Sequence, residues 1–385
     1  MAPKIGIVFL GHFARLGPHS GFTSAWFEAS QRGFPVPSYC VGVSAGAIAA
    51  ANLSQWNGAQ FRKTEETLIN LRPGQFYTVN PRLEVLGGLT ALAAFSLLLP
   101  INKIKNRWMR YGLTAGVIGG TLALEAIDIK ELLASDAIFS NERLKHLLAN
   151  VMDFDLAFNS PVAVEMVAVD MNTRCQVIVS NFRPEDRDPV RFIDGVVDST
   201  RIPGFFSARR ASPGHYYVDG AVISNSPIDL AERSGCDTIV AVQYTCASIG
   251  ATDTAYNHWL ETLQRSWDIV VDENTKLVLE KKTNIQNDLE QLEKAKTART
   301  LIEHLAGQDK VSPEVAELLA SAHALLSEAE RSYSFRGQKK TRLIVVKSRE
   351  VPAFHFRHFN SATMRDSINI GYDAFQSVRK EIETE

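Results

Sequence analysis

The first sixty residues alternate between short apolar runs and helix-forming segments. Residues 5–10 are an apolar run closed by a glycine, which is typical of a buried strand. The sequence then predicts a glycine-containing loop over 11–21 and a helix over 22–28. A second strand over 38–43 leads directly into the helix-forming stretch 45–51. This strand-loop-helix-strand-helix order indicates an α/β unit with a parallel sheet.

The same alternation returns later in the chain. A helix is predicted over 228–234 and a buried strand over 236–244. Further elements follow from the same patterns: a helix at 141–152, strands at 162–169 and 176–180, a strand at 342–347 and a closing helix at 361–379. Because sheet-forming segments lie at both ends, we expect one α/β domain over 1–385 that carries two helical insertions.

The first predicted insertion, 85–135, contains two long uncharged runs. No charged residue lies between Glu84 and Lys103, and a second uncharged stretch runs from Tyr111 to Leu124. A spanning helix needs about 20 apolar residues, so a transmembrane hairpin is marginal. A pair of buried helices and an interfacial hairpin are the other arrangements, and the latter would place the cations of the 103–110 link among anionic head groups. We predict a lid or a peripheral membrane contact through 85–124.

The second predicted insertion, 258–335, is rich in charge. Apolar residues from Ile285 to Leu305 follow a spacing of three and four amid Glu, Lys and Gln. This pattern predicts a long amphipathic helix that breaks at 307–310 and resumes from Pro313. Such a helical arm is a structural support, a partner surface or a cover for the core.

Composition narrows the class of protein. The 385 residues are 45% apolar and 22% charged, which excludes a disordered chain. With 41 basic and 43 acidic residues the net charge is -2, so a nucleic-acid partner is not expected. Four cysteines without short metal-ligand spacing indicate neither a disulfide scaffold nor a metal centre, and a reducing cytoplasm fits best.

Residues 42–46 match the G-x-S-x-G pattern, with Ser44 between Gly42 and Gly46. The motif follows an apolar strand and opens an Ala-rich helix, which is the strand-turn-helix setting that a nucleophile elbow requires. The glycines permit the tight turn and keep side chains away from the neighbouring strand and helix. The helix N-terminus favours negative charge that develops beside Ser44. A structural serine in a tight turn is the alternative.

A serine nucleophile needs a base. A catalytic triad in the order Ser, acid, His would use His304, His323, His355 or His358. None of these lies clearly in a loop that follows a predicted strand. Asp219 instead ends a short apolar strand and precedes a glycine. An acid there points over the carboxyl end of the sheet, where ligands bind in open α/β folds. A desolvated carboxylate can accept the serine proton, although an isolated Asp-Gly is more often a turn.

Together these residues resemble the patatin-like phospholipases, whose members use a Ser-Asp dyad. Gly220, Ala221, Asn225 and Pro227 stand where the family motif D-G-G/A-x-x-x-N-x-P places them after the acid. The stretch from Ser199 to Phe206 is similar to the S-x-x-x-P-x-x-F segment that precedes the acid in the family. The resemblance implies a three-layer α/β/α core with a mainly parallel sheet, and Ser44 and Asp219 as the dyad. It covers about 5–60, 140–245 and the closing elements.

The predicted oxyanion loop departs from the family pattern G-G-G-x-R/K-G. Two registers fit the sequence: Gly11 preserves the position after the first strand, whereas Gly17 and Gly21 preserve the step into the helix. Backbone N–H groups of this loop and of Ala45 are the predicted oxyanion donors. Fewer consecutive glycines make a weak or inactive enzyme a real alternative.

The sequence therefore predicts a serine acyl hydrolase that cleaves fatty-acyl esters of phospholipids or lysophospholipids. No cofactor and no metal are expected, because the chain lacks an HExxH motif, an EF-hand loop and a cysteine cluster. A catalytically weak or inactive membrane-associated scaffold on the same core is the main alternative. An acyltransferase or a Ser-His-Asp esterase is the third.

Overall fold

The structure of the chain is a computed structural model. The predicted insertion 85–135 and the residues 12–14 lie outside the described residues. The described residues are 4–11, 15–79, 137, 139–244, 259–306, 312–332, 340–346, 348–349, 351 and 360–384.

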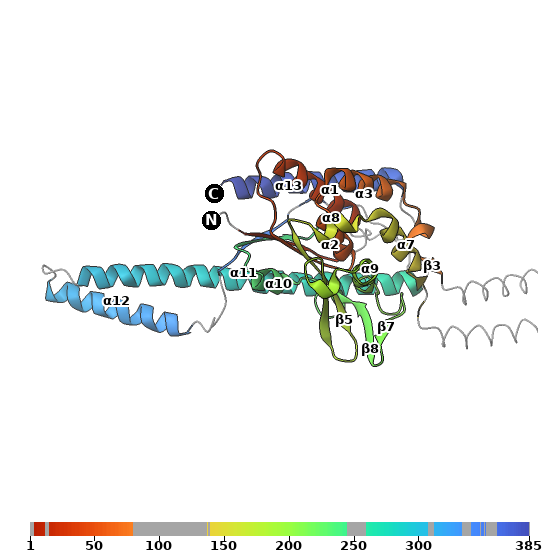
Figure 1. Cartoon of the computed structure of the whole chain (residues 1–385). Coiled ribbons are helices and arrows are strands. Elements are labelled where there is room, and N and C mark those ends of the chain that lie inside the picture. Colours follow the sequence, from red (N-terminus) through yellow and green to blue (C-terminus); the bar gives the residue numbers. More distant parts are fainter. Residues whose placement is uncertain are drawn as a thin grey trace, which may run out of the picture.

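The core is an eight-stranded mixed sheet (Figure 1). Its strand order is β10-β9-β1-β2-β5-β8-β7, and β6 pairs with β5 beside this path. The five strands from β10 to β5 are mutually parallel, whereas β6, β8 and β7 join by antiparallel pairing. The strands are β1 (Ile5–Phe9), β2 (Tyr39–Val43), β5 (Ala163–Asp170), β6 (Cys175–Ser180), β7 (Arg209–Ser212), β8 (His215–Asp219), β9 (Thr238–Val242) and β10 (Arg342–Val345).

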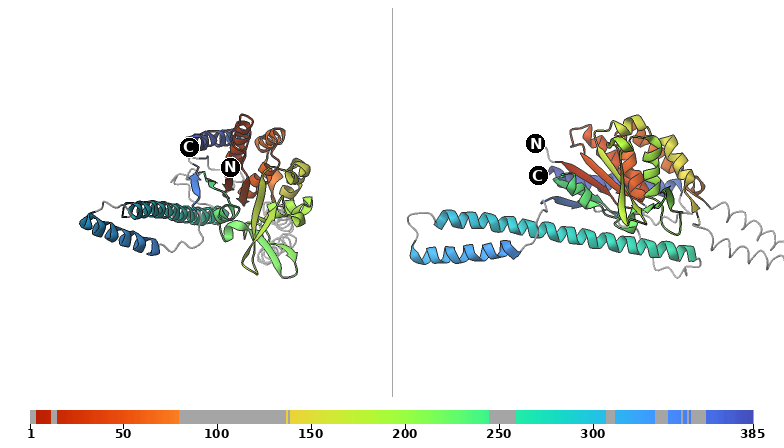
Figure 2. Two further views of the ribbon diagram at one scale, coloured as in Figure 1. Left: turned by 60° about the vertical axis from the view of Figure 1, so that its left-hand side comes forward. Right: turned by 60° about the horizontal axis from the view of Figure 1, so that its bottom comes forward.

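Helices cover both faces of this sheet (Figure 2). One face carries most of them: α1 (Leu16–Ser30), α2 (Ala45–Ser54), α3 (Gly58–Asn70), α7 (Glu142–Val151), α9 (Pro189–Asp198) and α13 (Ser361–Glu383). The other face carries α10 (Ile228–Arg233) and the start of α11 (Trp259–Ala306). Two short helices, α4 (Pro73–Phe76) and α8 (Phe154–Phe158), and the small sheet of β3 (Thr78–Val79) and β4 (Phe139–Ser140) complete the core. The predicted three-layer α/β/α fold is confirmed.

The apolar runs of the central strands are explained by burial on both faces. In β1 the side chains of Ile5, Ile7 and Phe9 pack with the α1 and α13 layer. Val8 and Leu10 belong instead to the second cluster, with α10 and α11. Successive side chains of a strand point to opposite faces, so a strand that is covered twice is apolar at nearly every position.

The helix predicted over 22–28 begins earlier, at Leu16. Gly17, Pro18 and Gly21 indicated a loop, but all three lie inside α1. Proline is compatible with the first helical turn, where its missing N–H leaves no hydrogen bond unmade. The glycines allow close helix packing, since a Cβ on Gly21 would lie 2.0 Å from the Ile368 carbonyl oxygen of α13. The loop prediction is therefore wrong from residue 16 onward.

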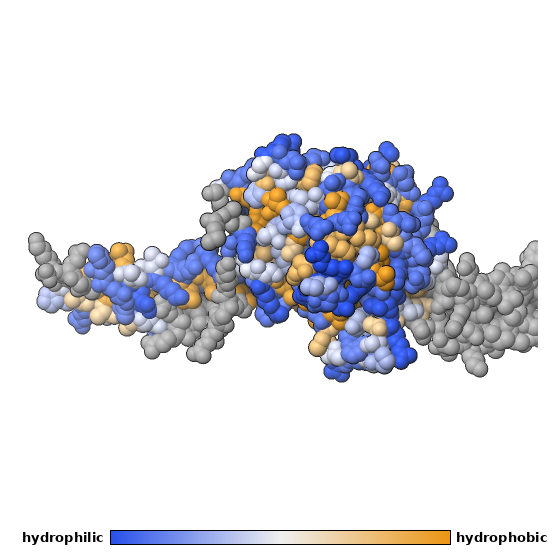
Figure 3. Space-filling view, in the orientation of Figure 1, coloured by the Kyte–Doolittle hydropathy of each residue, from blue (hydrophilic) through white to orange (hydrophobic). Residues whose placement is uncertain are grey.

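The predicted helical arm consists of α11 and α12 (Pro313–Ser332). The two helices lie side by side and extend well past the core (Figures 1 and 2). The arm is mixed in hydropathy (Figure 3), with Leu301, Leu318 and Leu325 among its exposed apolar side chains. Helix α11 starts at Trp259, before the predicted apolar stripe, and its first half packs on the sheet. Among the described helices none is both long and apolar enough to cross a bilayer.

Candidate active site

The ends of β2 and β8 meet on one edge of β5. Val43, the last residue of β2, pairs with Val167 of β5. Asp219, the last residue of β8, pairs with Ala168, the next residue of β5. The opposite edge of β5 is occupied by β6 along this whole stretch, so β2 and β8 share the remaining edge. The residue after Val43 and the side chain of Asp219 are therefore brought together where the two strands end.

Ser44 occupies a sharp turn between β2 and α2. Its backbone has φ 56 and ψ -125, a conformation that side-chain-bearing residues rarely adopt. The Ser44 N–H donates to the Ser199 hydroxyl oxygen at 2.8 Å, which holds the strained turn in place. The Ser44 side chain caps no backbone group of α2. Its hydroxyl is therefore not committed to the helix end.

Gly42 and Gly46 are required by the close approach of backbone segments. A Cβ on Gly42 would lie 2.0 Å from the Gly46 carbonyl oxygen, and a Cβ on Gly46 would lie 2.1 Å from the carbonyl oxygen of Phe9. These neighbours are backbone atoms and cannot rotate away. The two glycines let α2 start directly against β1 and β2.

Asp219 is a fully buried carboxyl, with 0% of its surface exposed. Burial raises its pKa to about 7, because the charged form is poorly solvated there, while the Ala221 N–H and the Ser44 hydroxyl lower the pKa. Oδ1 accepts the Ala221 N–H at 2.8 Å, and Oδ2 has no regular hydrogen bond among the described residues. The Ser44 hydroxyl is thus close enough to lower the pKa of the Asp219 carboxyl, but it does not form a regular hydrogen bond with it.

The residues after Asp219 shape the surroundings of Ser44. A Cβ on Gly220 would lie 2.3 Å from the Val167 carbonyl oxygen, so only glycine passes there. Asn225 is buried, and its Oδ1 accepts the Gly11 N–H at 2.8 Å. Pro227 precedes the first residue of α10. The motif after the acid therefore links the segment that follows β8 to the end of β1, through the hydrogen bond between Asn225 and Gly11.

Gly11 adjoins Ser44, but its N–H is already bonded to Asn225. A Cβ on Gly11 would lie 2.7 Å from the Ser44 Cβ, so the absence of a side chain leaves room beside the hydroxyl. In this structure the Gly11 N–H is therefore committed to Asn225, and the effect of Gly11 on the space around Ser44 is steric. Gly17 and Gly21, the other predicted loop donors, lie in α1 and are buried against α13.

Ala45 begins α2 directly after Ser44. The first four N–H groups of a helix have no intrahelical acceptor, and the helix dipole places partial positive charge there. The Ala45 N–H therefore remains a candidate donor to an anion formed at Ser44. His12, Phe13 and Ala14, the other part of the predicted oxyanion loop, lie outside the described residues.

Four of the described histidines have positions or partners that do not involve Ser44. His304 and His323 lie in the arm, on α11 and α12. His19 is buried, its Nε2 is 3.0 Å from the Leu10 carbonyl oxygen, and burial lowers its pKa to about 3. His215 pairs with Asp170 at 2.6 Å. His355 and His358 fall outside the described residues, and within the described residues no side chains cluster as a metal site would require.

Ser199 is a site residue whose part the sequence did not reveal. The S-x-x-x-P-x-x-F segment identified the residue, but only the structure shows its hydroxyl between the Ser44 N–H and the Val167 carbonyl oxygen.

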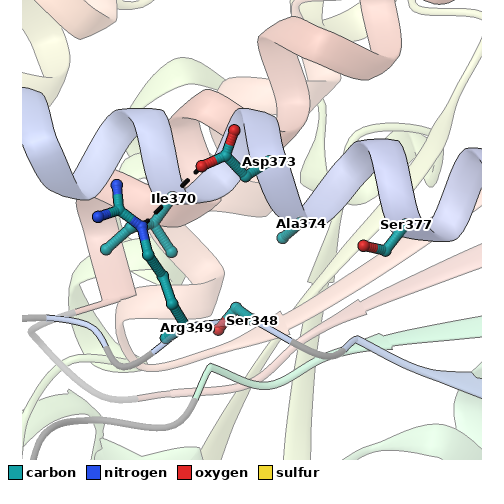
Figure 4. A pocket seen from close by; sticks show the side chains of 6 residues that line it. All are labelled: Ser348, Arg349, Ile370, Asp373, Ala374 and Ser377. Atoms are coloured by element: carbon teal, nitrogen blue, oxygen red, sulfur yellow. Dashed lines mark hydrogen bonds and ion pairs between the residues drawn. The ribbon is translucent and has the colours of Figure 1, made fainter.

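A pocket lies away from Ser44, between α13 and the segment after β10 (Figure 4). It is lined by Ser348, Arg349, Ile370, Asp373, Ala374 and Ser377, none of which belongs to the site around Ser44.

Comparison with known proteins places the chain in a family. The family model described as patatin-like phospholipase matches residues 6–232, more than half of the chain. Among solved structures, VipD from Legionella pneumophila aligns over 99% of this chain and 67% of its own, with 14% identity and a TM-score of 0.39. The search of curated proteins found no match. The extent of the family match shows that the chain belongs to the patatin-like phospholipases, a family of lipid acyl hydrolases.

Proposed function

We propose that the protein is a serine acyl hydrolase that cleaves fatty-acyl esters of phospholipids or lysophospholipids, with Ser44 as nucleophile and Asp219 as base. The observation that carries the proposal is the meeting of a strained serine elbow with a fully buried carboxyl at adjacent register positions of β5. Strained backbone and a strongly shifted pKa are both concentrated at functional sites.

In the proposed reaction Asp219 takes the Ser44 proton as the serine oxygen attacks the ester carbonyl carbon. The tetrahedral intermediate collapses, the C–O bond to the alcohol breaks, and Asp219 returns the proton to that alcohol. Water then attacks the acyl-serine while Asp219 takes one of its protons. The bond between the acyl carbon and the Ser44 oxygen breaks, and Asp219 returns the proton to Ser44 as the fatty acid leaves. A base with a pKa of about 7 suits both halves, because it accepts and returns a proton readily near neutral pH.

The Ala45 N–H is the proposed oxyanion donor among the described residues. It adjoins Ser44 at the start of α2, where an oxyanion would also meet the helix dipole. In known hydrolases the loss of one such donor costs about 3–4 kcal/mol of transition-state stabilisation.

Fatty-acid release tests the proposed function. Wild-type protein is incubated with phosphatidylcholine liposomes and with lysophosphatidylcholine micelles, and Ser44→Ala serves as the enzyme blank. We expect release from at least one acyl ester with wild type and none above background with the variant. Sphingomyelin, which carries an amide-linked chain and no acyl ester, is the control substrate. No release from any acyl ester by wild type would favour the inactive scaffold instead.

A contact of residues 85–124 with the membrane is part of this proposal. The uncharged runs and the cationic link support a peripheral position at a lipid surface. Such a contact would bring an ester bond to the site without a spanning helix.

Ser199→Ala is expected to lower kcat and weaken the fold moderately. The variant loses the acceptor of the Ser44 N–H and the donor to the Val167 carbonyl oxygen, so two backbone groups lose their partner. Each such loss costs about 1–3 kcal/mol when the group stays buried. The measurements are kcat for ester hydrolysis and chemical denaturation. Thr200→Ala is the matched control, because within the described part of the chain its hydroxyl bonds only to the Val197 carbonyl oxygen of the same turn. An equal loss of kcat there would contradict the assignment.

A further inference from the structure

Asp272 and Thr275 of α11 contact Arg15 and Asn225, the two side chains that bond to Gly11 beside the proposed nucleophile. We propose that Thr275 and Asp272 of α11 are positioning residues of the active site, which fix Gly11 next to Ser44. The proposal rests on the proposed function, since it assigns a part in the same reaction. Both residues lie beyond residue 232, where the match to the family model ends, so the family motif does not contain them.

Thr275 orients the Asn225 side-chain amide. Thr275 is fully buried, and its hydroxyl donates to the Val271 carbonyl oxygen at 2.7 Å. With its only proton committed, the hydroxyl oxygen can only accept, and it accepts from Asn225 Nδ2 at 3.0 Å. The amide nitrogen therefore faces Thr275, and it also donates to the Gly11 carbonyl oxygen at 3.4 Å, which leaves Oδ1 to accept the Gly11 N–H. A reversed amide would place two donors against each other at Gly11.

Asp272 is linked to the carbonyl oxygen of Gly11 through the side chain of Arg15. The Arg15 side chain is 1% exposed, and its Nη2 donates to Asp272 Oδ1 at 2.8 Å. Its Nη1 donates to the Gly11 carbonyl oxygen, and its Nε donates to the Tyr244 carbonyl oxygen at 3.2 Å. A guanidinium at this depth needs a counter-charge, because an unpaired buried charge is strongly unfavourable. Asp272 is the acid that pairs with Arg15 among the described residues.

Both backbone polar groups of Gly11 are therefore hydrogen-bonded, and each is linked to α11 through one intervening side chain. Its N–H reaches Thr275 through Asn225, and its carbonyl oxygen reaches Asp272 through Arg15. Since a Cβ on Gly11 would stand 2.7 Å from the Ser44 Cβ, any shift of Gly11 changes the space in which the tetrahedral intermediate forms. Small displacements of catalytic geometry, on the scale of 1 Å, lower rates by about 100-fold in known enzymes.

The test compares isosteric and conservative substitutions. Thr275→Val keeps the shape and removes the acceptor, whereas Thr275→Ser keeps the hydroxyl. Asp272→Asn removes the charge opposite Arg15 with little change of volume. Asp288→Asn is the matched control, because it lies 16 residues further along α11, about 24 Å away at 1.5 Å per residue. For each protein we would measure kcat and KM for fatty-acid release, the thermal midpoint, and the fraction of sites that a fluorophosphonate labels.

We expect Thr275→Val and Asp272→Asn to lower kcat by about 10- to 100-fold per labelled site, with KM little changed. Thr275→Ser and Asp288→Asn should retain the wild-type kcat. A merely structural role would reduce the labelled fraction and the thermal midpoint but leave kcat per labelled site intact.

Unchanged kcat per labelled site in both Thr275→Val and Asp272→Asn would overturn the positioning proposal, while an active wild type would leave the proposed function standing. A wild type that neither releases fatty acid nor labels at Ser44 would overturn both. If Thr275→Val does not fold, Asp272→Asn decides the question, since it keeps the packing volume nearly unchanged.

Discussion

Ser44→Ala should lower ester hydrolysis by about 10⁴-fold or more, as loss of the nucleophile does in other serine hydrolases. The reason is chemical: without the hydroxyl no acyl-serine can form, and only uncatalysed attack by water remains. The fold should survive, because the Ser44 side chain caps no backbone group and the Ser44 N–H keeps its bond to Ser199. Fatty-acid release and the thermal midpoint, measured on the same preparation, check both halves of this expectation.

A matched control separates the nucleophile from general damage to α2. Ser54 lies at the end of the same helix, and among the residues that the structure describes its hydroxyl bonds only to the Ala51 carbonyl oxygen. Ser54→Ala should therefore keep kcat near the wild-type value. Hydrolysis by Ser44→Ala at a rate close to that of wild type would show that another residue attacks the ester.

Asp219→Asn should abolish most activity, by about 10²- to 10⁴-fold, because an amide cannot take the serine proton. In wild type, kcat/KM should rise as pH increases through about 7, where the carboxyl loses its own proton and becomes a base. The variant should lack this rise. A wild-type profile that is flat between pH 5 and 9 would contradict Asp219 as the base.

The same substitution should stabilise the fold at alkaline pH. Below about pH 4 the carboxyl is protonated in both the folded and the unfolded chain. Between pH 4 and 7 the unfolded chain ionises at the ordinary aspartate pKa of 3.8 while the folded one keeps its proton, so the free energy of unfolding falls as pH rises. Above pH 7 the folded state carries the whole penalty, on the order of a few kcal/mol.

Asparagine at position 219 avoids this penalty and still accepts the Ala221 N–H through Oδ1. Asp219→Asn should therefore unfold at a higher denaturant concentration than wild type at pH 8, and at a similar concentration at pH 4. Chemical denaturation at the two pH values measures the difference. Lower stability of Asp219→Asn at pH 8 would show that the buried carboxyl is not destabilising in the folded state.

The parts of the fold that depend on local pattern were predictable from the sequence. The apolar runs of β1, β2 and β9 are covered on both faces, and the turn from β2 to α2 follows from glycines that no other residue can replace. The position of Asp219 at a strand end was also predictable. Its distance from Ser44 was not, because it depends on β2 and β8 sharing one edge of β5.

Long-range packing explains the errors. Gly17 and Gly21 suggested a loop because their reason for being glycine lies in α13, more than 300 residues later in the chain. The edge strand β7, Arg209–Ser212, was not predicted, because it is short and polar and lacks the alternation of apolar residues that marks a strand. Thr275 was missed because the predicted apolar stripe of α11 began only at Ile285. Val271 and Leu279, spaced four residues on either side of Thr275, would have extended the stripe to it.

Trapping of the covalent intermediate is the sharpest test of Ser44 as the nucleophile. Wild-type protein is acid-quenched during turnover of a short-chain ester, digested, and mapped by mass spectrometry. A Ser44 nucleophile predicts an added acyl mass on the peptide that contains Ser44, and no adduct in Ser44→Ala. An acyl group on a different residue, or fatty-acid release with no adduct under conditions that trap other serine hydrolases, is incompatible with the Ser44-Asp219 mechanism.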